Sequence, residues 1–372
     1  MHIVYFFTYG YSLKSWHDSG ILDREIRIFD NLIKKYNFKF TFVTYGDSSD
    51  HEYELNKNIK VLPIYTFINK SENNLLNIIK TFYLSKKIKS ETNNFDLIKQ
   101  NQLLGSWVSI ALKFSSNKPL YIRTGYDMFL FSIKDRKSPI KIFSYYILTA
   151  LALMFSNIYS VSSESDRKFL NKWFIFNKNK IVKRSNWVEN NKLKPFDERN
   201  SHRLLSVGRL EKQKNYKHLI TSLKGTNLSL DIIGVGDEKT QLEELAVKLN
   251  VDVNFLGIVS NNDLLKLYSN YKYFVSSSLF EGNPKATLEA MSSGCIVVTR
   301  DIANNREIID NFQNGILFDK SNYSLSKALL NLEDTKNLNN ISKNAITSTL
   351  KFNSLEKLTT EIAKDIQSFM KS

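Results

Sequence analysis

Two glutamates, Glu281 and Glu289, stand eight positions apart in the run FEGNPKATLEA at residues 280–290. Asn283 is a favourable N-cap residue and Pro284 suits the first position of a helix, so we expect a helix to begin at this point. Glu281 then lies in the preceding loop and Glu289 about a turn into the helix. Two carboxylates placed in this way can accept hydrogen bonds from two separate sets of hydroxyl groups, such as those of a sugar and of a ribose. The start of the helix can also hold an anion.

A basic segment, SVGRLEKQKN at residues 206–215, is the second group of residues suited to chemistry. Arg209 and Lys214 follow a predicted strand that ends in Gly208. Arginine can bind two phosphate oxygens at once, and lysine supplies a compact positive charge. Fixed cations of this kind would stabilise the negative charge that develops on a departing diphosphate. Taken alone, the segment could equally be a solvated basic turn.

The elements that must position these residues follow a regular alternation of short apolar runs and longer amphipathic segments. This pattern is typical of parallel sheets covered by helices. Strands are predicted at residues 3–7, 40–45, 97–99, 120–123 and 157–161, and again at 204–207, 228–233, 253–256, 273–276, 296–299 and 315–318. Gly208, Gly234 and Gly257 follow three of the later strands. Flexible backbone is therefore expected at the carboxyl edge of that sheet, where open α/β domains bind ligands.

Composition and charge exclude several classes of protein. The chain has 372 residues, of which 42% are hydrophobic and 24% charged, so it is neither fibrous nor wholly disordered. A single cysteine, Cys295, can form no internal disulfide, which favours a reducing compartment. The amino-terminal residues have no features of a signal peptide, and we expect a cytoplasmic protein.

Basic residues concentrate in the first half of the chain. Residues 1–200 hold 31 Lys and Arg against 18 Asp and Glu, a net charge of +13, whereas residues 201–372 carry only +2. Such a charge attracts anionic partners, although the base composition of a genome can also enrich lysine. A helix predicted at 139–155 is too short to cross a bilayer, which takes about 20 apolar residues. It would be buried or lie at a membrane interface, and we prefer the core role. The basic runs at 86–89 and 134–137 favour peripheral attachment to an anionic membrane surface.

The motifs together resemble the retaining GT-B glycosyltransferases of glycosyltransferase family four, the type called glycosyl transferases group 1. The resemblance covers residues 203–320 and rests on SVGRL with Lys214, GVGD at 234–237, FLG at 255–257, the two spaced glutamates and NGIL at 314–317. It implies an α/β GT-B fold of two Rossmann-like, doubly wound domains facing across a cleft. We expect residues 1–198 to form an acceptor-side domain, onto which a C-terminal helix at 352–372 crosses back. Residues 199–351 would form the nucleotide-sugar-binding domain.

The resemblance implies a role for each residue of these motifs. Arg209 and Lys214 would hold the donor diphosphate, Glu289 the ribose and Glu281 the transferred sugar. The remaining donor-binding positions would be Gly208, Gly234, the backbone of Gly282, Asn283, Pro284 and Lys285, and, around the base, Leu256, Gly257 and Ile258. The donor would be a nucleoside diphosphate sugar, with UDP or GDP expected. The family needs no metal, and the chain has no Asp-x-Asp motif, so we expect neither a metal nor a cofactor.

The first half resembles the family more loosely. Ser19 and Gly20 resemble the glycine loop that meets the donor. Many members place a histidine after a strand that here reads KPLYIRTGYD at 118–127 and contains none. Arg123 and Asp127 are the polar candidates there: Asp127 could take a proton from the acceptor hydroxyl or pair structurally with Arg123. Candidate acceptor contacts are Asn101 and His17, although an exposed histidine without a role is the alternative for His17.

The function implied is retaining transfer of a hexosyl-type sugar to a hydroxyl of a growing glycan. A bacterial surface polysaccharide pathway, lipopolysaccharide or capsule, is the expected setting, and a polyprenyl-diphosphate-linked saccharide the expected acceptor. One alternative keeps the fold and changes the reaction, to a nucleotide-sugar epimerase or a sugar phosphorylase. The other is a basic nucleic-acid-binding protein without catalysis, for which the sequence offers only charge. We therefore expect no nucleic-acid partner.

Overall fold

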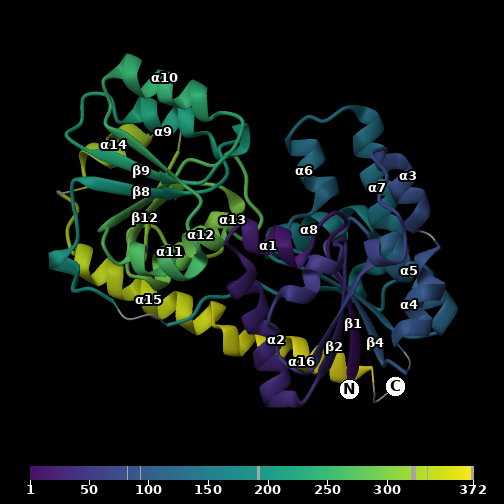
Figure 1. Ribbon diagram of the computed structural model, residues 1–372. Helices are drawn as coiled ribbons and strands as arrows, with labels where there is room; N and C mark the ends of the chain where they lie inside the picture. The colour runs from purple at the N-terminus through teal and green to yellow at the C-terminus, as the bar shows by residue number, and fades with distance from the viewer. Residues whose placement is uncertain (82, 93, 191–192, 320–323, 333, 370–372) are drawn as a thin grey trace. The chain divides into compact units, whose positions relative to one another are not determined.

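The computed structural model describes residues 1–81, 83–92, 94–190, 193–319, 324–332 and 334–369. The chain divides into two compact units (Figure 1). Unit 1 consists of Met1–Ser185 together with Thr359–Ser372, and unit 2 of Asn186–Leu358. Each unit is built around a sheet whose strands are parallel to their neighbours.

Unit 1 contains, among its described residues, a sheet of seven strands in the order β3-β2-β1-β4-β5-β6-β7. Their bounds are β1 His2–Phe6, β2 Lys39–Thr44, β3 Ile59–Pro63, β4 Leu97–Asn101, β5 Leu120–Thr124, β6 Ile158–Val161 and β7 Ile181–Lys183. β1 pairs with both β2 and β4, so Ile3 lies opposite Phe40 on one side and Leu97 on the other. The two strands at the edges, β3 and β7, were not predicted from the sequence.

Helices surround this sheet in the described part of unit 1. They are α1 Leu13–Asp18, α2 Leu22–Tyr36, α3 Asn74–Thr81, α4 Leu84–Thr92, α5 Ser106–Ser116, α6 Met128–Lys134, α7 Pro139–Phe155, α8 Glu164–Trp173 and most of α16, Leu355–Ser368, with the short turns η1 Ser48–Glu52, η2 Ile64–Thr66 and η3 Ile175–Lys180. Strand residues such as Ile3, Leu97 and Ile122 are fully buried. No helix in the described ranges combines the length and the hydropathy needed to span a bilayer.

Helix α7 differs from its prediction as a core helix. Only Thr149, Ala152 and Leu153 are buried along it, and five large apolar side chains on the opposite face are exposed. The preferred core role therefore holds for one face of the helix alone, because a run that is apolar all round does not reveal which of its faces has a neighbour.

Helix α16 is held to the sheet of unit 1 by a buried ion pair. Arg184, just after β7, donates from Nε to Asp365 Oδ2 at 2.7 Å and from Nη2 to Asp365 Oδ1 at 2.5 Å. The Tyr121 hydroxyl donates to the same carboxylate at 3.0 Å. Lys99 lies opposite Tyr121 in the neighbouring strand, with Nζ 3.8 Å from the centre of its ring. Burial lowers the pKa of Lys99 to about 7, and the charge of Arg123 acts in the same direction.

Unit 2 contains, in its described part, a sheet of six strands in the order β10-β9-β8-β11-β12-β13. Their bounds are β8 Arg203–Val207, β9 Ser229–Ile233, β10 Val253–Gly257, β11 Tyr273–Ser276, β12 Ile296–Arg300 and β13 Ile316–Phe318. In both sheets the chain moves outward from a central strand to one edge and then returns to the other side, which is the doubly wound Rossmann order. The prediction of an α/β chain with two doubly wound domains is confirmed.

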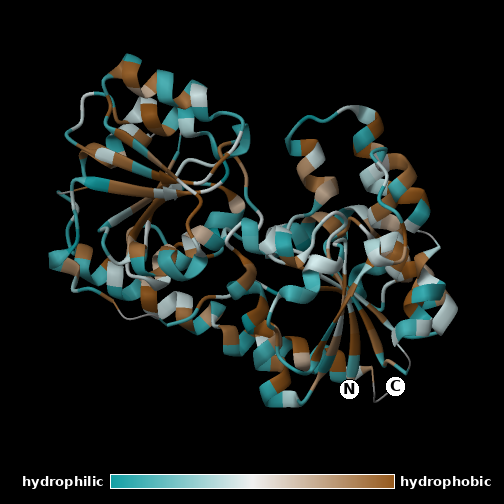
Figure 2. Ribbon diagram, in the orientation of Figure 1, coloured by the Kyte–Doolittle hydropathy of each residue, from teal (hydrophilic) through white to brown (hydrophobic). Residues whose placement is uncertain are grey.

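Helices cover both faces of this second sheet. They are α9 Tyr216–Ser222, α10 Lys239–Leu249, α11 Asn261–Tyr268, α12 Lys285–Ser292, α13 Ala303–Arg306, α14 Leu325–Leu330 and α15 Leu338–Asn353, with the turns η4 Phe196–Glu198 and η5 Lys212–Lys214. Leu204 belongs to the core on one face and Leu205 to the core on the other, since successive strand residues point to opposite sides. The strands are accordingly mostly brown in the hydropathy colouring of Figure 2.

The unit boundaries differ from the predicted ones, 198/199 and 351/352. The segment from Asn186 belongs to unit 2 because Asn186 bonds to Asn283, and Arg199 donates from Nη1 to Ser293 O at 2.8 Å. Val188 pairs with Ser354, which keeps the end of α15 and the start of α16 in the same unit. The predicted C-terminal helix runs through residues 370–372, which lie outside the described residues.

Candidate active site

The loops that follow β8, β9 and β10 are tied to one another at the carboxyl edge of the unit 2 sheet. Gly208 N donates to Ile233 O at 2.9 Å, and Gly234 N to Gly257 O at 2.8 Å. Gly234 has a φ of +145°, and a Cβ atom on it would lie 2.0 Å from Gly208 O. Only glycine fits there, so the predicted glycines hold two loops in close contact.

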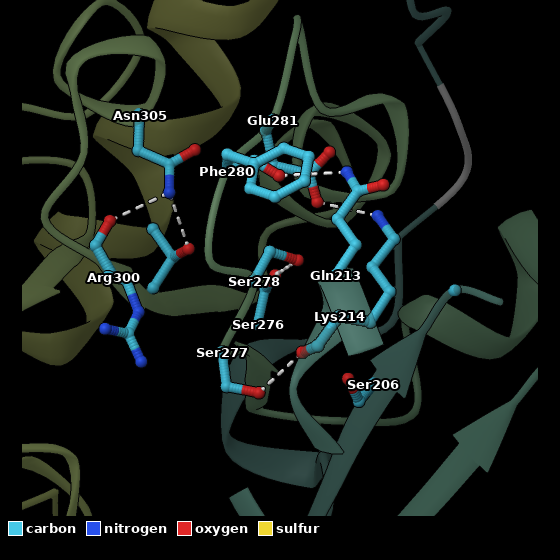
Figure 3. Close-up of polar contacts among 12 residues, drawn as sticks. Ser206, Gln213, Lys214, Ser276, Ser277, Ser278, Phe280, Glu281, Arg300 and Asn305 are labelled. Atoms are coloured by element: carbon cyan, nitrogen blue, oxygen red, sulfur yellow. Dashed lines mark hydrogen bonds and ion pairs between the residues drawn. The ribbon is translucent and has the colours of Figure 1, made fainter. Parts of the chain in front are cut away.

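The loops that follow β8 and β11 are joined by a second set of hydrogen bonds (Figure 3). Ser277 Oγ donates to Lys214 O at 2.9 Å or to Asn215 O at 2.8 Å. Gln213 Nε2 donates to Phe280 O at 2.9 Å, and Leu279 N donates to Gln213 O at 2.8 Å. β8 and β11 are the neighbouring strands at which the strand order reverses, and ligands of this fold bind at that point.

Lys214 and Glu281 are brought together by this arrangement, which the sequence did not predict. Lys214 Nζ lies 2.6 Å from Glu281 Oε1, and the two side chains are 22% and 9% exposed (Figure 3). A Cβ on Gly208 would lie 3.1 Å from Lys214 Cε, so the glycine leaves room for the lysine. Arg209 is 65% exposed and forms an ion pair with Glu211 at 2.8 Å.

The turn from Glu281 to Pro284 is fixed by two asparagines from other parts of unit 2. Asn304 Nδ2 donates to Gly282 O at 2.7 Å. Asn186 donates from its backbone N to Asn283 Oδ1 at 2.7 Å and from Nδ2 to Asn283 O at 2.5 Å. The four residues from Glu281 to Pro284 are all buried, so the turn is set by hydrogen bonds on both sides.

The prediction that Asn283 caps this helix was wrong. α12 begins at Lys285, its N-cap residue is Pro284, and no side chain makes a capping hydrogen bond. The Asn283 side chain instead accepts the bond from Asn186, which lies 97 positions away along the chain. The shift by one residue leaves the first turn of α12 without a side-chain acceptor, and Lys285, half-buried, is its first residue.

Glu289 lies in the second turn of α12, and its carboxylate is buried. Asn261 Nδ2 donates to Oε1 at 3.2 Å and the Tyr268 hydroxyl to Oε2 at 3.4 Å, both from α11. The predicted base-contacting residues lie at the end of β10: Leu256 and Ile258 are exposed, and Gly257 has a φ of +70° with open space around its Cα. Two exposed apolar side chains thus flank a glycine with left-handed backbone.

In unit 1, the predicted glycine loop lies between α1 and α2. Gly20 has a φ of +71°, which favours glycine, and its N donates to His17 O at 2.8 Å. The Ser19 hydroxyl donates to Ser15 O at 2.7 Å and so closes the end of α1. His17 is 64% exposed, beside Asp18 and with its ring 5.6 Å from that of Tyr53. The helix α1 separates this loop from β1, a feature absent from the prediction.

Asn101, Arg123 and Asp127 lie at the carboxyl edge of the unit 1 sheet. Asn101 ends β4 and is buried, and Arg123 lies in β5 and is half-buried. Asp127 is 1% exposed and is the N-cap of α6, where Oδ1 accepts a hydrogen bond from Leu130 N at 2.7 Å. Burial raises the pKa of Asp127 to about 7, partly opposed by that hydrogen bond. The capping bond supports a structural role for this carboxylate.

Several residues of the site were not foreseen in these roles: Gln213, Ser277, Asn304 and Asn186. The run Ser276-Ser277-Ser278 at the end of β11 was a usable signal, since serine at the end of a parallel strand can bind loop carbonyls. The asparagines gave no local signal, because their partners are distant in the sequence. Within the described ranges, no group of three or more His, Cys, Asp or Glu side chains is placed to hold a metal ion.

Residues 188–348 match the family model described as "Glycosyl transferases group 1". This range lies within unit 2 and includes the glycine loops, Lys214 and both glutamates. The chain resembles the GT-B glycosyltransferases. The resemblance predicted from the motifs is thereby confirmed.

Solved structures share the GT-B fold along the whole chain. Sucrose-phosphate synthase from Thermosynechococcus elongatus superposes with a TM-score of 0.82 at 15% identity, covering 100% of both chains. HepE from Anabaena, in complex with UDP and glucose, superposes with a TM-score of 0.76 at 18% identity, covering 99% of this chain and 100% of the other. At these identities the likeness establishes the GT-B fold alone.

Curated relatives match the chain over shorter stretches. An uncharacterised glycosyltransferase of Methanocaldococcus jannaschii is 39% identical over 30% of each chain. The N-acetylgalactosamine-N,N'-diacetylbacillosaminyl-diphospho-undecaprenol 4-alpha-N-acetylgalactosaminyltransferase of Campylobacter jejuni is 34% identical, over 32% of this chain and 33% of its own. The UDP-Gal:alpha-D-GlcNAc-diphosphoundecaprenol alpha-1,3-galactosyltransferase of Escherichia coli is 32% identical, over 39% and 40%. The matched part thus spans about a third of the length of these relatives.

Proposed function

We propose that the protein is a glycosyltransferase that moves a sugar from a nucleoside diphosphate sugar to a hydroxyl of a glycan. The observation that carries this proposal is the juxtaposition of Lys214, Glu281 and the uncapped start of α12 beside the point where the strand order of unit 2 reverses. A positive charge, a carboxylate and a helix N-terminus at this place suit a ligand that is anionic at one end and rich in hydroxyls at the other.

The donor diphosphate would interact with Lys214, Arg209 and the first turn of α12. An ammonium group has three donors, so Lys214 can keep its bond to Glu281 and also donate to a phosphate oxygen. Arg209 is exposed and lies on the same loop, where its guanidinium can bind two oxygens. These groups would stabilise the negative charge on the departing nucleoside diphosphate. We propose that the reaction needs no divalent metal, because this positive charge is supplied by the protein.

The two glutamates would bind hydroxyl groups at opposite ends of the donor. Glu281, fixed by Lys214 in the loop before α12, is assigned to the transferred sugar, and Glu289, held by Asn261 and Tyr268, to the ribose. Leu256 and Ile258 are assigned to the base. Transfer with retention of configuration is proposed from the resemblance of these motifs to retaining enzymes. A catalytic role for Asp127 or Arg123, and acceptor contacts from His17 or Asn101, stay predictions.

The acceptor is proposed to be a lipid-linked saccharide of a bacterial surface polysaccharide. Two relatives support this class, since each is named for transfer to a saccharide on diphosphoundecaprenol. UDP is the first donor nucleotide to test, because one of these relatives is named for a UDP-sugar and a structural neighbour was solved with UDP.

Calorimetric titration of UDP, GDP, ADP and dTDP into the metal-free protein tests the donor site. We expect one nucleotide to bind, and Glu289→Ala to weaken its binding by about 1–3 kcal/mol, the cost of losing a charged acceptor. Glu244→Ala removes an exposed carboxylate from α10 and serves as the matched control, which should leave binding unchanged. The donor assignment fails if no nucleotide binds, or if the two variants behave alike.

The reaction class is tested separately with the nucleotide sugar identified in this way. A transferase releases the nucleoside diphosphate faster when a saccharide acceptor is added. Sugar turnover that requires inorganic phosphate, or interconversion of two nucleotide sugars without an acceptor, would contradict the proposal and indicate a phosphorylase or an epimerase.

A further inference from the structure

One face of α7 exposes a continuous row of large apolar side chains. Its members are Ile140, Phe143, Ile147, Leu151 and Met154, of which Ile140 is 79% exposed and Phe143 64%. Spacings of three, four, four and three residues place them on a single side of a helix. The opposite side holds the buried Thr149, Ala152 and Leu153. The helix is therefore packed on unit 1 and still presents apolar surface to solvent.

Neighbouring elements extend this surface at the C-terminal end of α7. Phe114 of α5 is 65% exposed, and its ring lies 4.9 Å from that of Phe155. In η3, which packs against α7, Ile175 is exposed and Phe176 completely so. We call α7 with Phe114, Ile175 and Phe176 the α7 face. An exposed apolar surface with this continuity marks an interaction site in a folded protein.

The charges around the α7 face have one predominant sign. Arg136, Lys137 and Lys141 stand at the N-terminal end of α7 and are exposed. At the other end Lys180 donates from Nζ to Met154 O at 3.0 Å. Asp135 bonds to Lys137 at 2.5 Å, and no further Asp or Glu occurs in the sequence before Glu164. A partner that fits the α7 face therefore combines an apolar part, which meets the apolar row, with negative charge, which meets the basic residues.

We propose that the α7 face docks on an anionic lipid surface, with α7 lying in the plane of the membrane. Its apolar row would enter the boundary between headgroups and acyl chains, while the lysines and Arg136 bind lipid phosphates. A second copy of the chain is the less suitable occupant, because two α7 faces would bring like charges together. This proposal goes beyond the transfer reaction and does not depend on it, since lipid binding needs neither donor nor acceptor.

Vesicle flotation tests the proposal with the full chain. The wild type is mixed with vesicles of phosphatidylcholine alone and of phosphatidylcholine with phosphatidylglycerol, at low and at high salt. We expect binding to the vesicles that contain phosphatidylglycerol and weaker binding as salt rises. The triple variant Ile140→Ser/Phe143→Ser/Ile147→Ser should lose about tenfold or more in binding. Lys137→Gln/Lys141→Gln should weaken binding and reduce its salt dependence.

The matched control is Val247→Ser/Leu330→Ser/Phe352→Ser, which removes three exposed apolar side chains from unit 2. It should bind vesicles as the wild type does. Since all six side chains are exposed, the Tm of both triple variants should equal that of the wild type, which excludes unfolding as the cause of lost binding. The proposal is overturned if the wild type binds neither vesicle, or if both triple variants bind equally well. It is also overturned if the wild type sediments as a dimer that the α7 variant alone dissociates.

Discussion

Lys214 Nζ lies 2.6 Å from Glu281 Oε1, and the two residues come from loops that follow the neighbouring strands β8 and β11. The bond joins the basic segment to the glutamate loop, which the sequence presents as separate motifs. Both side chains are mostly shielded from water. Removal of either one would therefore leave the other charge without its partner.

A double-mutant cycle on Lys214 and Glu281 should therefore show coupling. Lys214→Met and Glu281→Gln should each lower the free energy of unfolding, and their effects should differ from additivity by about 1–3 kcal/mol. Urea unfolding of the two single variants and the double variant measures this. Additive effects would mean that the ion pair contributes nothing to the folded state. Lys239 and Glu243, an exposed pair of α10, provide the comparison cycle, in which about 0.3–0.5 kcal/mol is expected.

Gly234→Ala should disrupt the contact between the loops after β8 and β9. The added Cβ would lie 2.0 Å from Gly208 O, so one of the two loops must move, at a cost of about 2–4 kcal/mol in the free energy of unfolding. Nucleotide affinity should fall as well, because Gly208 borders Lys214. Gly225→Ala is the control: its φ is +79° but no atom lies within 4 Å, so only backbone strain of about 1 kcal/mol is expected. Equal costs for the two variants would contradict the close contact.

The buried carboxylate of Asp127 predicts a pH dependence of stability. Its pKa is raised from 3.8 to about 7 in the folded protein. Between these two pH values the carboxyl group is therefore protonated in the folded state and ionised in the unfolded chain. Its contribution to the free energy of unfolding is complete below about pH 4 and is lost as the pH rises toward 7. Asp127→Asn keeps the acceptor for Leu130 N and removes the titration. The variant should gain stability relative to the wild type between about pH 5 and pH 8.

Asp47→Asn is the control for this measurement. Asp47 is also an N-cap, at the start of η1, but hydrogen bonds from Ser49 lower its pKa. The Asp47 carboxylate is therefore fully ionised above about pH 5. The difference in the free energy of unfolding between this variant and the wild type should stay constant from there up to pH 8. A constant difference for Asp127→Asn as well would show that its carboxylate titrates normally.

The Arg184–Asp365 pair predicts strong destabilisation when one partner is lost. Asp365→Asn leaves Arg184 and Lys99 without the neighbouring carboxylate, which should cost about 3–5 kcal/mol. The double variant Arg184→Met/Asp365→Leu should be less damaging than the single one, because no unpaired charge stays behind. In a Trp187→Phe background, the fluorescence of Trp16, Trp107 and Trp173 reports the unfolding of unit 1. A double variant as unstable as Asp365→Asn would show that packing, not charge, holds α16.

The sequence predicted the central strands of both units because each is a short apolar run bounded by turn residues. It missed β3 and β7, which are edge strands: β3 includes Pro63, and β7 has three residues, of which one is Lys183. An edge strand needs only one partner, so its apolar pattern is weaker and proline is tolerated there. The loops of the candidate site were also predicted, because their glycines and charged residues lie close together in the sequence.

What the sequence could not predict depends on partners that are distant along the chain. The N-cap assignment failed because Asn283 bonds to Asn186, and local rules consider only the following helix. The preference for a core role of α7 holds for one of its faces alone, because hydropathy does not say which face of a helix is covered. Asp127, by contrast, follows the local rule: it stands immediately before a run of apolar residues and is the N-cap of α6.

The division of unit 1 has a consequence for its synthesis. Lys99 and Arg184 are made early, whereas Asp365 follows every residue of unit 2 along the chain. As the chain leaves the ribosome, unit 2 can therefore be complete while the sheet of unit 1 still lacks the carboxylate that its cations require. The part of the protein that is translated first is thus the part that finishes folding last, and it is in this interval that unit 1 depends most on protection from aggregation.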